Sequence, residues 1–244
     1  MKKKLITCLD VRDGKLTKGV KFLGNKDLGC PIEAARKYCQ DGIDEVVLYD
    51  FSATHEKRGT RFDTVEAVAK VLTVPFGVGG GIKTIEDCRA AVKAGADKVH
   101  INSAAVRTPE LIAEAAKEMK VVLSMDVLAV DENKFEVVID GGRTKTGMDA
   151  VEWAKRGVEL GACEVVVNSI DADGVREGFH IPSTKAIAQA VSVPVVASGG
   201  GGTIEHIREV LTEGGATVAL VASMLHFGEY TVQEIKAGLG DVLS

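Results

Sequence analysis

The two halves of this 244-residue sequence resemble each other, and this repeat limits the possible folds more than any other feature. Residues 42–47 return as residues 161–166, and at the same offset the Thr-Ile-Glu of 84–86 returns at 203–205. The Val-Pro and Gly-Gly pairs between these segments repeat at that offset as well. A regular repeat indicates a duplicated structural unit. We therefore expect two similar halves that combine into a single domain, residues 1–244.

Short apolar segments alternate with amphipathic segments of helical length along the chain. The apolar segments predict eight strands, at residues 5–9, 45–50, 74–82, 99–103, 121–125, 164–168, 194–198 and 218–223. The amphipathic segments predict helices at residues 31–38, 64–72, 84–94, 109–119, 148–160, 183–191, 203–212 and 231–239. This order predicts an α/β fold, a (β/α)8 TIM barrel built from two repeated half-barrels. A doubly wound open sheet is the alternative, but it would not explain the equal halves.

Two segments do not fit this alternation. Residues 12–29 form a polar connection that is too long for an ordinary strand–helix loop, so we expect a lid or a disordered segment there. The lysines of this segment are Lys15, Lys18, Lys21 and Lys26. Residues 135–140 alternate between apolar and polar, which predicts a small hairpin with residues 127–130.

The composition excludes several classes of protein. A formal net charge of -5 argues against a nucleic acid or an anionic membrane as partner. No apolar run approaches the length of a membrane span, and the basic start at residues 2–4 lacks the features of a signal peptide.

Cysteine and histidine usage bears on location and cofactors. The five cysteines are scattered without Cys-x-x-Cys spacing, which is typical of a reduced, cytoplasmic protein. The five histidines show no metal-ligand spacing. We therefore predict neither a metal site nor a bound cofactor.

Two predicted strands, one in each half, lead into an aspartate. Residues 5–9 run into Asp10 and residues 121–125 run into Asp126, and a valine follows each aspartate. In a barrel the strand ends meet at one rim, so the two carboxylates would face each other across one mouth. Such a pair can exchange protons on opposite faces of a substrate. Either aspartate alone could equally cap a turn, but their matched positions favour a pair with a chemical role.

Glycine-rich turns follow a strand in each half, at residues 79–81 and 199–202. Backbone amides at such turns bind phosphate, because small residues let the anion approach closely. Ser103 and Ser223 end the next strands along the chain and could complete each site. Either turn alone could be only a tight connection. Two equivalent turns predict a substrate with a phosphate at each end.

Several motifs carry a resemblance to a known family. They are Cys-Leu-Asp-Val at 8–11, Val-Gly-Gly-Gly-Ile at 78–82, Gly-Ala-Asp-Lys-Val at 95–99, Asn-Ser-Ile-Asp-Ala-Asp-Gly at 168–174 and Ala-Ser-Gly-Gly at 197–200. With these motifs the chain resembles, over essentially its whole length, the cyclase subunit of imidazole glycerol phosphate synthase from histidine biosynthesis. The sister isomerase of that pathway shares the fold and the phosphate sites. Its first strand ends differently, and it lacks the Asn-Ser-Ile-Asp run.

The resemblance implies a lyase that uses ammonia to convert a bis-phosphorylated ribulosyl aminoimidazole carboxamide ribotide. The products would be imidazole glycerol phosphate and aminoimidazole carboxamide ribotide. It implies catalytic roles for Asp10, Asp126 and Lys18. Substrate or phosphate contacts are expected from Asp50, Gly81, Asn102, Ser103, Asn168, Asp173, Gly174, Ser198, Gly200 and Ser223. A non-catalytic sugar-phosphate-binding barrel is an alternative, against which the intact aspartate pair argues.

The resemblance also implies a partner, a glutaminase subunit that forms a heterodimer at the opposite face of the barrel and delivers ammonia through it. Lys4, Glu45, Lys98 and Glu164 begin four of the strands and would form the ammonia gate. Charges at inward-facing positions are costly unless they are paired. The alternative is a salt-bridge cluster that only stabilises the bottom of the barrel.

The chain departs from the family at four positions near the second glycine turn. Val175 replaces the usual threonine, Gly201 replaces an alanine, and Phe179 and His180 stand where Tyr-Asp is common. We expect these changes to alter the geometry of one phosphate site rather than the fold.

Overall fold

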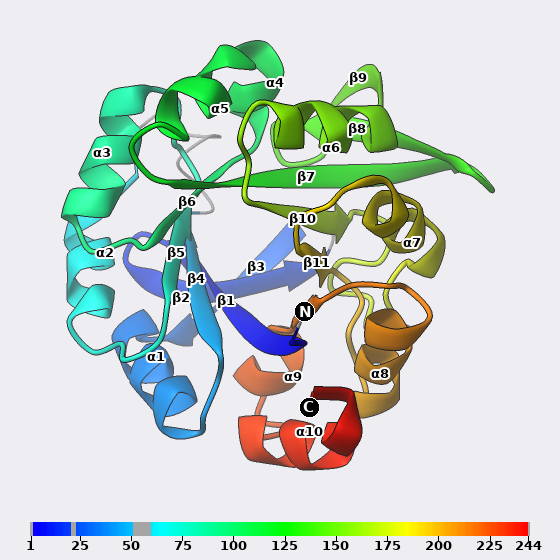
Figure 1. Ribbon diagram of the computed structural model, residues 1–244. Helices are drawn as coiled ribbons and strands as arrows, with labels where there is room; N and C mark the ends of the chain where they lie inside the picture. Colours follow the sequence, from blue (N-terminus) through cyan, green and yellow to red (C-terminus); the bar gives the residue numbers. More distant parts are fainter. Residues whose placement is uncertain (1, 21–22, 51–59, 244) are drawn as a thin grey trace.

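Eight parallel strands close into a barrel in the computed structural model, which describes residues 2–20, 23–50 and 60–243 (Figure 1). In chain order they are β1 (Lys4–Arg12), β4 (Glu45–Asp50), β5 (Phe76–Gly79), β6 (Lys98–Ile101), β7 (Lys120–Asp131), β10 (Glu164–Ser169), β11 (Val195–Ser198) and β12 (Val218–Leu220). Each strand pairs in parallel with the next, and β12 pairs with β1 to close the ring. The predicted (β/α)8 barrel is confirmed.

Helices between the strands form the outer layer. They are α1 (Pro31–Gln40), α2 (Phe62–Ala69), α3 (Ile85–Lys93), α5 (Glu110–Ala115), α6 (Ala150–Glu159), α7 (Ile181–Ala190), α8 (Ile204–Thr212) and α10 (Val232–Leu239). Shorter turns α4 (Ser103–Arg107), α9 (Ser223–His226) and the 3-10 helix η1 (Gly240–Leu243) were not predicted. The repeated Thr-Ile-Glu marks the start of α3 and α8. In each helix the threonine hydroxyl, on Thr84 and Thr203, accepts a backbone N–H of the first turn.

The strands are buried on both faces, which explains their nearly continuous apolar sequences. In β1 the side chains of Leu5 and Leu9 pack against the helices, while those of Ile6 and Cys8 belong to a separate cluster inside the barrel. The inner cluster contains small and branched residues from other strands, such as Val166 on β10. Because side chains alternate along each strand, the inward-facing set of β1 continues to Asp10 at the carboxyl end.

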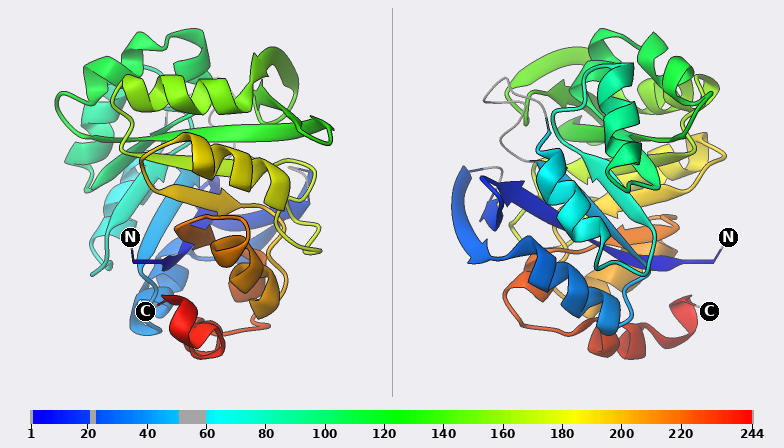
Figure 2. Two further views of the ribbon diagram at one scale, coloured as in Figure 1. Left: turned by 45° about the vertical axis from the view of Figure 1, so that its right-hand side comes forward. Right: turned by 90° about the vertical axis from the view of Figure 1, so that its left-hand side faces the viewer.

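Residues 15–20 and 23–29 form the two strands of a hairpin, in the segment where we expected a lid or a disordered connection. Its strands are β2 (Lys15–Val20) and β3 (Leu23–Gly29), and Lys21 lies outside the described residues. Asp13 and Gly14 form the two-residue turn between β1 and β2, both with positive φ. Asp-Gly is a favoured sequence for this turn, and the signal is present in the sequence. Figure 2 shows this hairpin at one end of the barrel, with the start of β1 and the end of α10 at the other.

The excursion after β7 contains the predicted hairpin and one additional strand. Strand β7 continues beyond the barrel and pairs antiparallel with β8 (Lys134–Ile139), as expected. A third strand, β9 (Thr144–Asp149), pairs with β8 and was not predicted. Among the described residues, the helices are too short or too polar for any of them to cross a membrane.

Candidate functional site

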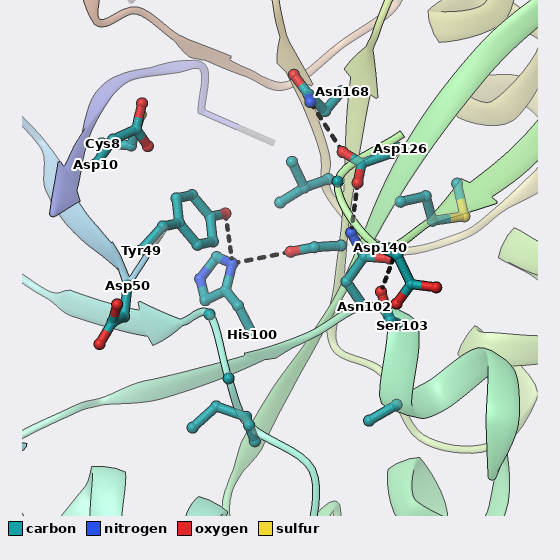
Figure 3. Close-up of a pocket in the computed structure, with 18 of the residues that line it drawn as sticks. Cys8, Asp10, Tyr49, Asp50, His100, Asn102, Ser103, Asp126, Asp140 and Asn168 are labelled. Atoms are coloured by element: carbon teal, nitrogen blue, oxygen red, sulfur yellow. Dashed lines mark hydrogen bonds between the residues drawn. The ribbon is translucent and has the colours of Figure 1, made fainter. Parts of the chain in front are cut away.

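A cavity of about 600 Å³ opens among the carboxyl ends of the barrel strands, the usual position of active sites in this fold. Both predicted aspartates and Lys18 line it, and Figure 3 shows Asp10 and Asp126 on opposite sides. Seven of the predicted contact residues also line this cavity: Asp50, Gly81, Asn102, Ser103, Asn168, Asp173 and Ser198.

Asp126 is buried between two amide side chains (Figure 3). The Nδ2 atoms of Asn102 and Asn168 donate to its two carboxylate oxygens, each at 2.9 Å. Burial raises the pKa of Asp126 to about 6, although both amides favour the charged form. The carboxylate is therefore ionised near neutral pH but takes up a proton far more readily than an ordinary aspartate.

Asp10 is paired with a cation. The Nζ atom of Lys18 donates to its Oδ2 atom at 2.9 Å and lies 3.7 Å from a carboxylate oxygen of Asp173. Burial disfavours the lysine cation, but the two carboxylates outweigh it and hold the pKa of Lys18 well above its ordinary value. Burial raises the pKa of Asp173, partly offset by the Lys18 charge. The hairpin thus brings a permanent positive charge to Asp10.

One end of the cavity lies at the first glycine turn. Gly80 and Gly81 both have positive φ, and a Cβ atom on Gly80 would lie 2.6 Å from the backbone nitrogen of Asp50. The side chain of Asp50 is buried and accepts the Arg61 backbone N–H at 3.0 Å, which ties the end of β4 to the start of α2. Ser103 follows β6 and its hydroxyl also lines the cavity. This end offers glycine amides and a hydroxyl to an anion.

A smaller cavity of about 30 Å³ adjoins the first and lies at the second glycine turn. It is lined by the remaining predicted residues, Gly174, Gly200 and Ser223, and shares Asp173 and Ser198 with the larger cavity. Gly200 is required here because a Cβ atom would overlap the carbonyl oxygen of Gly178. The structure thus brings every predicted catalytic and contact residue to one continuous region.

Two departures from the family pattern compensate for each other at this second end. A Cβ atom on Gly201 would lie 2.9 Å from the ring of Phe179, so the glycine makes room for the phenylalanine. His180 caps the start of α7, where its ring nitrogen accepts the Ser183 backbone N–H at 3.3 Å. Nothing in the structure explains Val175.

Sequence reasoning missed three polar residues inside the barrel, Tyr49, His100 and Ser124. The Nδ1 atom of His100 lies 3.0 Å from the Tyr49 hydroxyl and 3.2 Å from that of Ser124 (Figure 3). Burial and the Lys98 charge lower the pKa of His100 to about 3, so the ring is neutral. All three side chains occupy alternate, inward-facing positions of predicted strands, and this was the signal that could have found them.

Three of the four charged residues predicted as a gate, Glu45, Lys98 and Glu164, form an ion-pair cluster at the opposite end of the barrel. Lys4 begins β1 at the same end and acts on Glu164 through its charge. Lys98 Nζ donates to Glu45 at 2.8 Å and to Glu164 at 3.0 Å, and both carboxylates are buried. Burial raises the pKa of Glu164, an effect that the charges of Lys98 and Lys4 oppose. Within the part of the chain that the structure describes, no group of three or more His, Cys, Asp or Glu side chains is placed to hold a metal ion.

Comparison with known proteins finds a matching family model and several similar proteins. A family model described as histidine biosynthesis protein matches residues 4–231. The chain is 52% identical over 244 residues to the imidazole glycerol phosphate synthase subunit HisF of Desulfovibrio desulfuricans, which covers 97% of this chain and 94% of that protein. It is 49% identical over 251 residues to the subunit of the same name from Nitratidesulfovibrio vulgaris, with 98% and 97% covered.

Proposed function

The chain belongs to the histidine-biosynthesis protein family and, within it, to the HisF subunits of imidazole glycerol phosphate synthase, and on that premise we propose which residues perform its reaction. HisF is the cyclase subunit of that synthase, and the chain is a lyase. The substrates we propose are ammonia and a bis-phosphorylated ribulosyl aminoimidazole carboxamide ribotide. Imidazole glycerol phosphate and aminoimidazole carboxamide ribotide would be the products.

One observation carries the proposal. A carboxylate between two amides, Asp126, faces a carboxylate paired with a lysine, Asp10, across one cavity. Ammonia addition to a ketone, loss of water, cleavage of a C–N bond and ring closure all require protons to move. Two carboxylates in different environments suit such a sequence, because one can take up protons while the other remains charged.

We assign the role of general base to Asp126. Its pKa of about 6 makes it a stronger base than an ordinary aspartate while leaving it ionised at neutral pH. It would take the proton that the attacking nitrogen loses. Asp126 would then return this proton to the departing oxygen, which leaves as water. The Asp10 carboxylate, which Lys18 holds on the other side of the cavity, would accept the proton that the nitrogen releases when the ring closes and give it to the nitrogen of the C–N bond that breaks.

The two phosphates would lie at the two glycine turns. Gly81 and Ser103 would hold one, and Gly174, Gly200 and Ser223 the other. Asn102 and Asn168 would contact the central part of the substrate while they hold Asp126. This arrangement would fix the reacting atoms between the two carboxylates, which is a large part of what an active site contributes to rate.

We further propose that ammonia arrives from a glutaminase subunit docked at the amino ends of the strands. Lys4, Glu45, Lys98 and Glu164 would form the gate through which it enters. The barrel interior between gate and cavity is lined by small apolar side chains and by the neutral His100. Because these side chains offer no acidic proton, they would not convert ammonia to ammonium.

Ammonia-dependent cyclisation by the isolated chain tests the proposal. The purified chain, given an ammonium salt and the bis-phosphate substrate at a pH where free ammonia is plentiful, should release both products. No glutaminase should be needed under these conditions. A wild-type chain that binds the substrate yet forms neither product would refute the assignment.

A further inference from the structure

The turn between β8 and β9 covers the first glycine end of the cavity. Asp140 begins this turn with φ +58, and its backbone N–H donates to the Ser103 hydroxyl at 3.0 Å. The carboxylate of Asp140 also lines the cavity, as Figure 3 shows beside Ser103. A negative side chain therefore lies directly beside the hydroxyl that is proposed to bind a phosphate.

Arg107 holds that carboxylate. Its Nη2 atom donates to both carboxylate oxygens of Asp140, each at 2.7 Å. Burial works against the charged form of Asp140, but the arginine and the Thr144 hydroxyl outweigh it and keep the pKa of the carboxyl below its ordinary value. Arg143 donates to the Asp140 carbonyl oxygen at 2.9 Å, so two guanidinium groups converge on this turn.

Arg107 is placed where a phosphate at Ser103 could reach it. The two residues begin and end α4, four positions apart, so their side chains emerge on the same face of that turn. Arg107, Arg143 and Lys83 all line the cavity at this end, against two acidic residues, Asp50 and Asp140. The positive charge there exceeds the negative charge, as an anion site requires.

We propose that Arg107 binds the substrate phosphate at the Gly81–Ser103 end, and that Asp140 is the partner it gives up when the phosphate arrives. The inference rests on the proposed function, because that function supplies the phosphate. A guanidinium group binds a carboxylate and a phosphate in the same planar geometry, so the ligand can take the place of Asp140 without moving α4. The Arg107 side chain is about half exposed, at 53%, and an ion pair at such a position contributes little and exchanges readily.

Asp140 then determines which anions can bind to Arg107. In the free protein it occupies Arg107 and repels weakly charged anions that cannot compete with a carboxylate. A phosphate dianion carries more charge and more acceptor oxygens, so it displaces the carboxylate. This gives the first end a preference for phosphate that the glycine amides and the Ser103 hydroxyl alone do not provide.

A calorimetric titration with inorganic phosphate tests the inference without any turnover. The wild-type chain should bind phosphate at two sites, and Arg107→Met should weaken one of them about tenfold, the usual worth of a charge-assisted hydrogen bond. The phosphate affinity of Arg107→Lys should fall between those of the wild-type chain and Arg107→Met, because lysine keeps the charge but lacks the planar set of guanidinium donors. Arg89→Met is the matched control: Arg89 binds Glu118 at 2.6 Å on the surface and does not line the cavity, so both sites should remain.

Asp140→Asn distinguishes competition from mere positioning. If Asp140 competes with phosphate, the variant should bind phosphate more tightly at the first site. Weaker binding would show that Asp140 only orients Arg107, and displacement would be wrong. Unchanged phosphate affinity in Arg107→Met, or a wild-type chain that binds no phosphate at this end, would overturn the assignment of Arg107.

Steady-state kinetics with the bis-phosphate substrate and ammonia separate this inference from the proposed function. Arg107→Met should raise KM about tenfold and leave kcat nearly unchanged, because the contact exists both before and during the reaction. A fall in kcat alone would contradict the binding role. Absence of turnover in the wild-type chain would instead refute the proposed function, whatever the phosphate titration shows.

Discussion

The Nζ atom of Lys18 lies 2.9 Å from Asp10, and through this contact a hairpin outside the barrel is joined to the carboxyl end of the first strand. Both side chains are largely buried, with exposed fractions of 10% and 14%. The pair is therefore shielded from solvent ions and keeps its charges in one place. The position of the β2–β3 hairpin and the chemistry of Asp10 consequently depend on each other.

Lys18→Met should lower the ammonia-dependent kcat by about 10- to 100-fold, because Asp10 loses a charge-assisted hydrogen bond. Lys18→Arg should restore part of the loss, since it keeps the charge. Lys15→Met is the control: Lys15 lies on the same strand but is exposed and pairs with Asp27 at 3.4 Å outside the cavity. Equal losses in the Lys15 and Lys18 variants would mean that only hairpin stability matters.

Asp10→Asn and Asp126→Asn should each lower kcat by about 10²- to 10⁴-fold, the usual worth of a general acid or base. The cavity should keep its shape, because asparagine has the size of aspartate. Melting temperature and substrate affinity measured on both variants check this. Turnover at the wild-type rate in both would refute the two-carboxylate mechanism.

The pH dependence of kcat/KM for the bis-phosphate substrate, measured at a fixed concentration of free ammonia, should report Asp126. A base with a pKa of about 6 is lost by protonation as the pH falls, so activity should decline below pH 6 and level off above it. Asn102 and Asn168 donate to the charged form, so removing either amide should raise the pKa of Asp126. Asn102→Ala and Asn168→Ala should therefore move the acid limb to higher pH. A limb that moves to lower pH would contradict the assignment.

Gly81→Ala should raise KM for the bis-phosphate substrate several-fold or more. Gly81 has φ +77, which alanine adopts with strain, and the new methyl group would stand where a phosphate approaches the amides. Gly147→Ala is the control, because Gly147 has φ +73 and an added Cβ atom there would meet nothing within 4 Å. Similar kinetics in both variants would show that backbone strain, not phosphate binding, explains the effect.

The features of the fold and site that follow from the periodicity of strands and helices could be predicted from the sequence. The barrel followed from the repeat and the strand–helix alternation. Asp10 and Asp126 followed from their place at matching strand ends. The β2–β3 hairpin was not predicted, because the length of its polar segment is typical of a lid or a disordered connection, although Asp13–Gly14 carries a turn signal.

Other parts of the site could not be predicted, because they depend on contacts between distant segments. The Asp140 turn reaches Ser103 over 37 positions, and nothing local in either segment indicates the contact. The neutral state of His100 follows from burial inside the closed barrel. Arg107 lies between a predicted strand and a predicted helix, and only the fold brings it to Asp140 and to the cavity.

Replacement of Lys98 distinguishes two interpretations of its cluster, an ammonia gate and a purely structural set of ion pairs. Lys98 bridges two buried glutamates, Glu45 and Glu164, so Lys98→Met leaves both carboxylates without their ion-pair partner. Breaking a buried pair costs about 3–5 kcal/mol, and unfolding in denaturant should show a loss of that order. Lys120→Met is the control: Lys120 is the neighbour of Lys98 in the sheet and is exposed.

The two nitrogen sources then decide the role of Lys98. With the glutaminase partner and glutamine, Lys98→Met should turn over poorly or uncouple glutamine hydrolysis from cyclisation, because ammonia must pass the altered cluster. With added ammonia the loss should be much smaller, since free ammonia enters the cavity from its open side. Lys98→Arg, which keeps the charge and the barrel stability, should show the same contrast more weakly. Equal losses with both sources in both variants would mean that the cluster only stabilises the barrel.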